Sequence, residues 1–379
     1  MPIKNILNVA VISPRYGLVG GSEHFAMEVT ERLALNPNLS IHVFANKWQA
    51  MSDRITFHKY PIIKFPRFFQ PISTAFFVQK MISKQKFDII HTHERIFGAD
   101  IYSIHGLPHQ YWIKNIRKKK RMSLFDYYTH YIETKLVMNP RCQHLLAVSQ
   151  STKEIFCQSF QLPNDKVKIV PPGVDLSKFS CNERIQCRKD IRKGLGMSES
   201  DIVILFVGMN FEIKGLPQLM TAISKTLDKN LGHSLKLIVV GKGDFQRYKF
   251  LASQLNIQDH INFTGIIAQD IEKVYLASDI FSMLSEFDTF GMTVLEAMAS
   301  GMPVIVSRNV GAKDIVTHGM NGYIVDADDT DSISSHIIEL LNHDFRNTLA
   351  KAASETAQKY TWDRTTEQIQ TIYDLYGNQ

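Results

Sequence analysis

The chain has 379 residues, more than twice the ~150 residues typical of one domain, so we expect two large domains. Its composition, 44% hydrophobic and 21% charged, is ordinary for a globular protein and excludes a disordered, collagen-like or coiled-coil chain. The net charge of +6 is divided unevenly, because residues 1–175 carry 23 basic and 12 acidic side chains whereas residues 176–379 carry 20 and 25.

The first apolar run, Ile6–Ile12, is too short to span a bilayer, and no small-residue cleavage site follows it, so we expect a buried strand. No other stretch reaches the ~18 uninterrupted apolar residues of a membrane span, and any contact with a membrane is therefore predicted to be peripheral. The four cysteines form no CxxC pair, which favours a reducing compartment. They are Cys142, Cys157, Cys181 and Cys187.

Short β-branched runs alternate with longer amphipathic stretches along both halves, a pattern typical of parallel strands joined by crossover helices. The predicted strands of the first half are Ile6–Ile12, Ser40–Phe44, Asp88–His91, Ile101–Ser103, Leu145–Ser149 and Lys168–Val170. Those of the second half are Ile202–Val207, Leu235–Val240, Ile261–Phe263, Ile280–Met283 and Pro303–Val306. The predicted fold class is therefore α/β, with two doubly wound domains in tandem.

The segment Pro171–Asp175 separates the two halves. Its two prolines stiffen the chain and its glycine lets the chain turn. Because the alternation restarts after this segment, we place the domain boundary between residues 175 and 176. We also expect a cleft between the carboxyl ends of the strands of the two domains.

Two glycines, Gly20 and Gly21, follow the first predicted strand and open a helix that runs to about Ala34. Paired glycines let backbone N–H groups approach a ligand, and the positive end of a helix favours phosphate. A plain strand-to-helix turn explains the same residues equally well. The segment is neither a GxGxxG fingerprint nor a GxxxxGK[ST] loop, which weakens both familiar nucleotide-binding interpretations.

Two segments of the second half place charged groups near predicted strand ends. Lys214 stands in a loop where an ammonium group would meet a diphosphate, although most single loop lysines are simply solvated. Asp288 lies in a loop and Glu296 eight residues later, inside a predicted helix. Two carboxylates at this spacing can reach different parts of one ligand, such as a ribose and a hexose. The alternative is an N-cap aspartate and a surface glutamate.

The stretch from Asp288 to Gly301 resembles the EX7E segment of the family 4 retaining glycosyltransferases, or glycosyl transferases group 1, which have the GT-B fold. Further segments resemble the same family in the same order: GGSEHFAMEVTERLA, DIIHTH, PPGVD, FVGMNFEIKG, VYLASDIFSMLS and GAKDIVTHGMNGYIVDADD. The tail YTWDRTTEQIQTIY resembles the closing helix of the family. This resemblance implies that residues 360–379 pack back on the N-terminal domain, which leaves residues 176–359 as the nucleotide-sugar-binding domain.

The resemblance implies roles for residues of the second half. Glu296 takes the place of the glutamate that binds the ribose hydroxyls, and Asp288 that of the carboxylate near the donor sugar. Aspartate is one methylene shorter than the glutamate of the family at this position, so Asp288 is a departure from the pattern. The backbone N–H groups of Phe290, Gly291 and Met292 are implied to face the donor sugar and the pyrophosphate.

A second departure concerns the pyrophosphate, which the family grips with an arginine and a lysine. This chain has Met209 where the arginine would stand, and only Lys214 remains. The charge of the leaving group is then left to Lys214, to helix dipoles and to the amides around Gly20 and Gly21.

On the N-terminal side, His105 matches by position a histidine that the family places near the donor sugar. Nine of the 14 histidines lie in residues 1–175, and most such histidines are satisfied polar residues, so the position match alone selects His105. Glu94 is a weaker candidate for contact with the acceptor.

The implied reaction transfers a hexose from a UDP- or GDP-linked sugar to a saccharide acceptor, with retention at the anomeric carbon and an oxocarbenium-like transition state. The departing phosphate oxygen would deprotonate the incoming hydroxyl on the same face, so no carboxylate has to act as nucleophile. No cofactor and no metal are expected, since helix dipoles and lysine replace divalent charge. Asp326-Ala327-Asp328 matches the DxD pattern of metal-dependent transferases, but we interpret it as a chance acidic turn.

Six of the eight residues in Lys114–Arg121 are basic, and Tyr111, Trp112 and Ile113 precede them. Basic residues beside aromatic anchors suit anionic headgroups, each contributing ~1 kcal/mol near the surface. Phe65–Phe69 forms a second aromatic and basic patch. A solvated helix face or a nucleic-acid patch is the alternative, but no nucleic-acid motif accompanies the segment and no nucleic-acid partner is expected. The candidate residues of this acceptor or membrane side are Lys114, Arg117, Lys118, Lys119, Lys120 and Arg121.

The resemblance is closest in style to the lipopolysaccharide core hexosyltransferases. It implies a glycolipid acceptor and a cytoplasmic protein bound peripherally to anionic lipid at the inner face of the cytoplasmic membrane, with the basic half toward the bilayer. Two other functions stay open. A nucleotide-sugar epimerase or dehydrogenase would need a GxGxxG fingerprint, which is missing, and a catalytic Tyr-xxx-Lys. A catalytically weak or inactive GT-B nucleotide-sugar-binding protein would fit the missing arginine and the aspartate at position 288.

Overall fold

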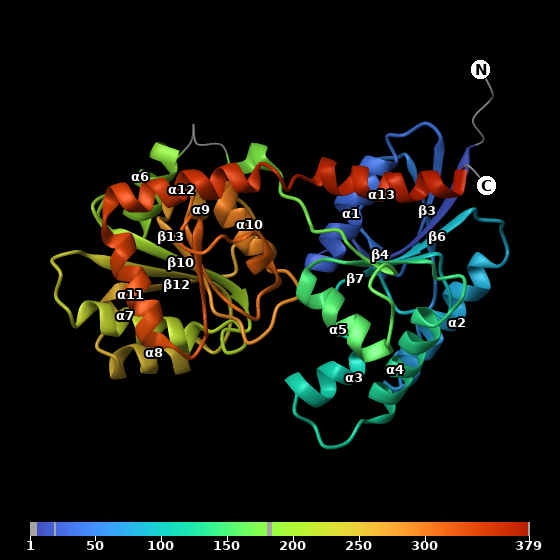
Figure 1. Cartoon of the computed structure of the whole chain (residues 1–379), viewed down its shortest axis with the longest axis horizontal. Coiled ribbons are helices and arrows are strands. Elements are labelled where there is room, and N and C mark those ends of the chain that lie inside the picture. The colour runs from blue at the N-terminus through green and yellow to red at the C-terminus, as the bar shows by residue number, and fades with distance from the viewer. Residues whose placement is uncertain (1–5, 19, 180–183, 378–379) are drawn as a thin grey trace. The chain divides into compact units, whose positions relative to one another are not determined.

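The computed structural model of the chain forms two compact units. The residues that it describes are 6–18, 20–179 and 184–377. The first unit comprises Met1–Gly173 and Trp362–Gln379, and the second comprises Val174–Thr361. Figure 1 shows that each unit is a sheet with helices on both faces, which confirms the predicted α/β class.

The first unit is built on a seven-stranded parallel sheet, counted over the described residues, in the order β5-β3-β1-β6-β7-β8-β9. Its strands are β1 (Leu7–Ile12), β3 (Leu39–Ala45), β5 (Ile55–Lys59), β6 (Ile89–Thr92), β7 (Ile101–Ile104), β8 (His144–Ala147) and β9 (Val167–Ile169). Two short strands, β2 (Arg15–Tyr16) and β4 (Lys47–Trp48), pair separately with each other.

Helices cover both faces of this sheet. They are α1 (Gly21–Leu33), α2 (Phe69–Ile82), α3 (His109–Tyr111) with a π-helical turn over Trp112–Ile116, α4 (Leu124–Val137), α5 (Gln150–Phe160) and α13 (Trp362–Gly377). Val78, Leu136 and Phe156 come from α2, α4 and α5 and pack into one core with strand residues such as Ile12. The helices α1 and α13 lie on the opposite face (Figure 1).

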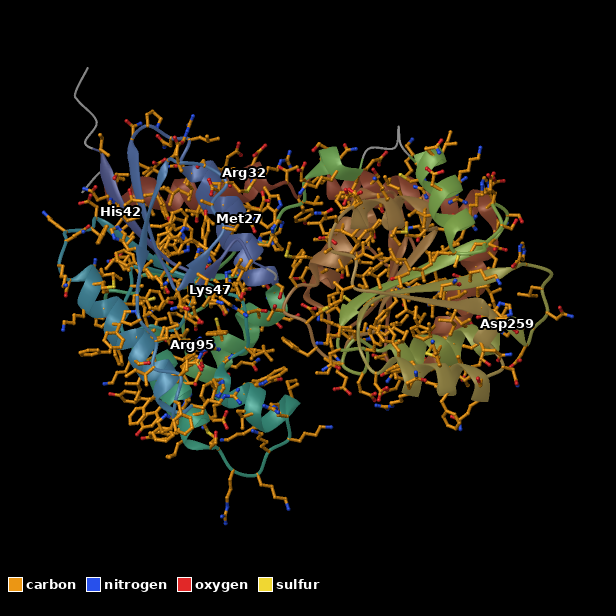
Figure 2. The ribbon with its side chains drawn as sticks, turned by 180° about the vertical axis from the view of Figure 1, so that it is seen from behind. Met27, Arg32, His42, Lys47, Arg95 and Asp259 are labelled. Carbon is orange, nitrogen blue, oxygen red and sulfur yellow. The ribbon has the colours of Figure 1, made fainter. Side chains whose placement is uncertain are left out.

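The last helix, α13, belongs structurally to the first unit. Arg32 of α1, labelled in Figure 2, donates from Nε to Asp363 of α13 at 2.9 Å. At the other end of α13, Tyr373 Oη and His91 Nδ1 share a hydrogen bond of 2.7 Å, and both side chains are buried. The helix therefore completes the core of the first unit, although it comes from the C-terminal end of the sequence.

The second unit has a six-stranded parallel sheet over its described residues, in the order β12-β11-β10-β13-β14-β15. Its strands are β10 (Ile202–Met209), β11 (Leu235–Lys242), β12 (Ile261–Gly265), β13 (Ile280–Met283), β14 (Val304–Ser307) and β15 (Gly322–Val325). Its α-helices are α6 (Arg184–Gly194), α7 (Leu216–Leu227), α8 (Phe245–Gln254), α9 (Ile271–Ala277), α10 (Met292–Ala299), α11 (Thr330–Leu341) and α12 (His343–Ala357).

In Figure 1 the helices α7, α8 and α11 cover one face of this sheet and α6, α9, α10 and α12 the other. Both faces are therefore buried, which accounts for continuous apolar runs such as that of β10. The sequence pattern did not predict β5 and β15, and both are edge strands whose apolar signal is short. Cys142 and Cys157 are buried free thiols, Cys187 is buried, and Cys181 lies outside the described residues.

Candidate functional site

Lys214 and Asp288, predicted from separate loops of the second unit, lie side by side. Lys214 follows β10 and Asp288 follows β13, and these neighbouring parallel strands end at the same edge of the sheet. Lys214 Nζ donates to Asp288 Oδ2, and both side chains are about four-fifths buried, at 22% and 18% exposure. The candidate phosphate-binding cation and the candidate catalytic carboxylate thus form one ion pair.

Backbone contacts hold these two loops together. Ser285 Oγ donates to the carbonyl of Ile213 at 2.9 Å, and the N–H of Glu286 donates to the same oxygen at 2.8 Å. Gly215 has φ 77°, and a Cβ added there would lie 2.2 Å from the carbonyl oxygen of Leu284. Only glycine fits where the backbone at position 215 passes the backbone at Leu284, so the position of Lys214 relative to Asp288 is set by the backbone.

The backbone of Asp288 is also fixed. Its N–H donates to the Asn309 carbonyl at 3.1 Å, and its own carbonyl accepts from Gly311 at 3.0 Å. Its side chain Oδ1 accepts from the N–H of Phe290 at 3.1 Å. One of the three backbone donors that the family resemblance implies for the ligand is therefore bonded to Asp288 in this structure.

Gly291 and Met292 form the start of α10. Gly291 has φ 91°, and a Cβ at this residue would lie 2.9 Å from Val310 Cγ1, so the turn into the helix requires glycine. Phe290, by contrast, buries its ring to 3% exposure, and its carbonyl accepts from Ala312. These contacts place the first turn of α10 at the same edge of the sheet as Lys214 and Asp288.

Glu296, in the middle of α10, is held by a tyrosine that the sequence pattern did not single out. Tyr275 of α9 donates from Oη to Glu296 Oε2 at 2.7 Å. Burial raises the pKa of the Glu296 carboxyl, although the Tyr275 hydrogen bond and nearby Lys178 oppose this shift. The hydrogen bond engages one carboxylate oxygen and leaves Oε1 to accept from a ligand. The helix period could have identified Tyr275 as buried but not as the partner of a residue 21 positions away.

Met209, which stands where the family has arginine, is the last residue of β10 and is half exposed. The register of β10 and β11 pairs Met209 with Lys242, which is exposed at the end of β11. A second lysine thus lies next to the position of the missing arginine. The strand-end GKGD segment was visible in the sequence, but the register that brings it beside Met209 was not.

In the first unit, His105 follows β7 and belongs to a group of histidines. His93 Nδ1 and His105 Nε2 share a hydrogen bond of 2.9 Å, their rings stack with centroids 5.2 Å apart, and Phe25 meets His105 edge-on at 4.9 Å. Burial lowers the pKa of His105 to about 4 and that of His91 to about 3. These imidazoles are therefore neutral at pH 7, so His105 can donate or accept a hydrogen bond but carries no charge.

Gly20 and Gly21 lie at the N-terminus of α1, where the glycine-rich turn was predicted to meet phosphate. Gly20 has φ 148°, and a Cβ there would lie 2.2 Å from Glu23 Oε2. Glu23 is 8% exposed and accepts from Arg15 at 2.5 Å. A carboxylate of the chain therefore already lies beside this helix end, so any anion would share the site with Glu23 and Arg15.

Glu94 follows β6 and accepts from the backbone N–H of Arg95 at 2.7 Å. Arg95, labelled in Figure 2, donates from Nε to fully buried Glu133 at 2.8 Å and from Nη2 to the Leu107 carbonyl at 3.2 Å. Glu133 also accepts from the N–H of His109 at 2.6 Å. The ion pair of Arg95 with Glu133, together with the hydrogen bond from His109, fixes the backbone just before the basic segment.

The basic residues of Lys114–Arg121 are all exposed, and nitrogen-tipped side chains point outward from the turquoise loop after α3 (Figure 2). One of them is tied down, because Lys119 Nζ lies 3.8 Å from Asp126 in the first turn of α4. Ile113 is buried and is not a surface anchor, contrary to the prediction for the aromatic stretch before the segment.

The two patches predicted separately in the first unit come together on α4. Arg67 lies over the Phe125 ring, 5.1 Å from its centroid, and Phe68 stacks on Tyr128 with centroids 6.3 Å apart. The segment before α2, the first residue of α2 and α4 also carry large exposed side chains, led by Phe65 at 87% exposure. The others are Phe69, Leu124, Tyr127 and Tyr131. Over the described residues, none of the helices is long and apolar enough to cross a bilayer.

Two family models match the chain. The family described as Glycosyltransferase Family 4 matches residues 19–178, and the one described as Glycosyl transferases group 1 matches residues 188–360. The first match falls mainly on the first unit and the second on the second unit. Together they cover all the candidate site residues and every strand of the two sheets except β1.

Curated relatives match over most of the chain. An uncharacterised glycosyltransferase of Methanocaldococcus jannaschii is 29% identical over 304 residues, covering 78% of this chain and 77% of that protein. N-acetyl-alpha-D-glucosaminyl L-malate synthase of Bacillus anthracis is 25% identical over 94% of each chain. D-inositol 3-phosphate glycosyltransferase of Stackebrandtia nassauensis is 25% identical over 95% of this chain and 88% of that protein.

Among solved structures, WaaG, a glycosyltransferase involved in lipopolysaccharide biosynthesis, has a TM-score of 0.81 at 18% identity and covers 96% of this chain and 99% of its own. Anabaena HepE in complex with UDP and glucose has a TM-score of 0.72 at 18% identity, covering 97% and 99%. At such identities the likeness establishes the fold, which is GT-B, and not the substrates.

Proposed function

This chain belongs to the group 1, family 4 glycosyltransferases, and we propose that it moves a hexose from a UDP- or GDP-linked sugar to a saccharide acceptor with retention at the anomeric carbon. The observation that carries this proposal is the ion pair of Lys214 and Asp288 at the carboxyl edge of the second sheet, with Glu296 on α10, the helix that begins at this edge. Ligands of doubly wound sheets bind at this edge. HepE, which has the same fold, was solved with UDP and glucose bound.

We assign one task to each of these side chains. Glu296 accepts from the ribose hydroxyls through the oxygen that Tyr275 leaves available. Lys214 has three N–H donors, so it can keep its bond to Asp288 and still donate to a phosphate oxygen as the leaving group gains charge. Lys242 adds a second cation beside Met209. We expect no metal and no cofactor for this step.

His105, in the first unit, is a neutral hydrogen-bonding group. Because its imidazole is uncharged at pH 7, it can hold a sugar hydroxyl by a hydrogen bond that carries no net charge. His93, its partner at 2.9 Å, restricts the orientation of the ring. The departing phosphate oxygen then remains the base for the acceptor hydroxyl.

The test of this function is acceptor-dependent turnover by the full chain. A thermal-shift screen of UDP- and GDP-linked hexoses first identifies the donor, because a bound ligand raises the apparent stability. Release of nucleoside diphosphate is then measured with and without saccharide acceptors, and NMR gives the anomeric configuration of the product. We expect release only with acceptor, and the donor configuration in the product. Donor binding without release across the panel would instead support a catalytically inactive nucleotide-sugar-binding protein.

We further propose that the acceptor is a glycolipid at the inner face of the cytoplasmic membrane, as in lipopolysaccharide core synthesis. Exposed aromatic side chains beside basic ones on the first unit support it, as does the likeness to WaaG, which is involved in lipopolysaccharide biosynthesis. Two curated relatives instead carry the names of small acceptors, malate and inositol 3-phosphate. The exposed surface around Phe65 and α4 favours the glycolipid, because a small soluble acceptor gives no reason for it.

Membrane binding should depend on the four exposed basic residues that follow the π-helical turn and do not contact α4. We expect replacement of Arg117, Lys118, Lys120 and Arg121 by glutamine to weaken binding to vesicles of anionic lipid about a hundredfold or more, at roughly 1 kcal/mol per residue. Co-sedimentation at increasing vesicle concentration measures the change.

A matched variant replaces four exposed lysines of the second unit by glutamine: Lys189, Lys229, Lys249 and Lys351. It removes the same charge from the chain, so it should bind vesicles like the wild type. Equal losses in the two variants would mean that net charge alone drives the association. No loss in the first variant would end the membrane proposal, while donor hydrolysis should be the same in all three proteins.

A further inference from the structure

A polar pocket opens in the second unit at the edge of the sheet opposite the carboxyl ends of the strands. Its volume is about 310 Å³, and residues of α6, α12 and the loops that precede β13 and β14 line it. The lining residues are Arg184, Arg188, Asp279, Gly301, His343, Arg346, Asn347 and Ala350. We call it the arginine pocket.

The pocket has a large excess of positive charge. Three arginines line it, and among its described lining residues the only carboxylate is Asp279. That carboxylate already accepts from Arg188 at 2.6 Å, from buried Arg192 at 2.7 Å and from the N–H of Val203 at 2.8 Å. Asp279 is therefore already shared by two guanidinium groups.

Backbone carbonyls contact the other two guanidinium groups. Arg184 donates to the carbonyls of Ser300 and Ser278 at 2.8 and 3.1 Å, and Arg346 donates to that of Leu340 at 2.6 Å. Carbonyl oxygens orient a guanidinium without cancelling its charge. Arg346 is only 9% exposed. Burial lowers the pKa of its guanidinium, and the charges of Arg188 and Arg192 add to this shift although Asp279 opposes it.

The guanidinium groups of Arg188 and Arg346 can meet an anion. Like charges are held close together in a partly buried place, and of the five N–H donors in its rigid fork Arg346 uses those of Nη1 for the carbonyls of Leu340 and Leu341. Phosphate oxygens match this fork and can accept from two arginines at once. A volume of about 310 Å³ suits a small ligand and not a polymer.

The pocket is separate from the ion pair of Lys214 and Asp288. Asp279 directly precedes β13, whereas Asp288 follows that strand. Likewise, Gly301 follows α10, whereas Gly291 precedes it. The two sites therefore lie at opposite ends of the same strand and the same helix.

We propose that the arginine pocket binds a small phosphate-bearing anion, either inorganic phosphate or the phosphate group of a small metabolite. The ligand accepts hydrogen bonds from Arg188 and Arg346, with Arg184 behind them and Asn347 and His343 at the rim. Binding does not require transfer activity, so this site stands or fails independently of the function proposed above.

The experiment titrates the full chain at low ionic strength with inorganic phosphate, pyrophosphate and glucose 6-phosphate, followed by calorimetry. The key variant is Ala350→Glu, which places a carboxylate in the pocket on a helix that tolerates glutamate and keeps every arginine. We expect affinity for the tightest probe to fall at least about tenfold. Ala350→Gln, which matches it in size but not in charge, should bind within about twofold of the wild type.

Two further variants locate the site. Arg188→Gln should also weaken binding, because Arg192 still neutralises Asp279 and the fold retains that ion pair. Lys214→Ala, in the other site, should leave the affinity of the probe unchanged. A preference for glucose 6-phosphate over inorganic phosphate would identify a phosphate ester as the ligand, and the reverse would identify the free ion. The proposal is overturned if none of the three probes binds, if Ala350→Glu binds like Ala350→Gln, or if Lys214→Ala abolishes binding.

Discussion

Replacing Glu296 by alanine is expected to weaken binding of the nucleotide diphosphate sugar about 10- to 100-fold, because a hydrogen bond to a charged group contributes about 1.5–3 kcal/mol. The carboxylate lies in α10 and has one oxygen fixed by Tyr275. Calorimetry with the donor that the thermal-shift screen selects measures the loss. Glu296→Gln should fall between alanine and wild type, since the amide oxygen still accepts from Tyr275 and from a ribose hydroxyl.

The control for this change is Glu355→Ala, which removes an exposed glutamate from α12 of the same unit. It should leave donor affinity unchanged. Alanine at position 296 also leaves the buried Tyr275 hydroxyl without its acceptor. The Tyr275→Phe variant and the double variant Glu296→Ala, Tyr275→Phe therefore show whether a loss of donor affinity merely reflects a loss of protein stability. Donor affinity in Glu296→Ala equal to that of the wild type would rule out the ribose-binding role.

Replacing Lys214 by alanine is expected to lower kcat about 100- to 1000-fold, the usual effect of removing one donor that stabilises developing charge. Lys214 is the lysine next to the candidate catalytic carboxylate. We propose that, with Met209 in place of the arginine that the family resemblance implies, Lys214 carries a larger share of the leaving-group charge. The affinity for the donor should fall much less than kcat. Steady-state assays of nucleoside diphosphate release measure both.

A double variant separates two explanations for this loss. Lys214→Ala leaves Asp288 as an unpaired, largely buried carboxylate, which would repel the pyrophosphate. In Lys214→Ala, Asp288→Asn that repulsion is absent, so donor affinity should recover while kcat stays low. Recovery of kcat to the wild-type value would mean that Lys214 only neutralises Asp288. The matched control is Lys225→Ala, which breaks an ion pair with Asp331 on the surface and should leave kcat unchanged.

The sequence allowed the architecture to be predicted because local patterns determine it. Buried parallel strands such as β10 and β13 are continuous apolar runs, and amphipathic helices connect them. The edge strands β5 and β15 were not predicted, since a short, half-covered strand has little apolar signal. Lys214 and Asp288 could be proposed separately from their loops, because strand ends carry ligand contacts in this kind of sheet.

The pairings within the site could not be predicted, because each joins residues far apart in the sequence. The bond between Lys214 and Asp288 depends on the order of β10 and β13 in the sheet, and Lys242 comes beside Met209 only through the register of β11. The neutral state of His105 depends on burial under Phe25, which belongs to α1. Strand order, register and burial are properties of the folded chain, so they cannot be predicted from local patterns in a single sequence.

The position of α13 has a consequence for biosynthesis. The first unit lacks the partner of His91 Nδ1 until Tyr373 has been synthesised, whereas the second unit has all its described strands and helices by residue 357. At roughly 5–20 residues per second, the 200 residues between Gly173 and Tyr373 take about 10 to 40 s to add. During that interval the ribosome carries a first unit with one face of its sheet incompletely covered. We therefore expect the second unit, although encoded later, to complete its native core first.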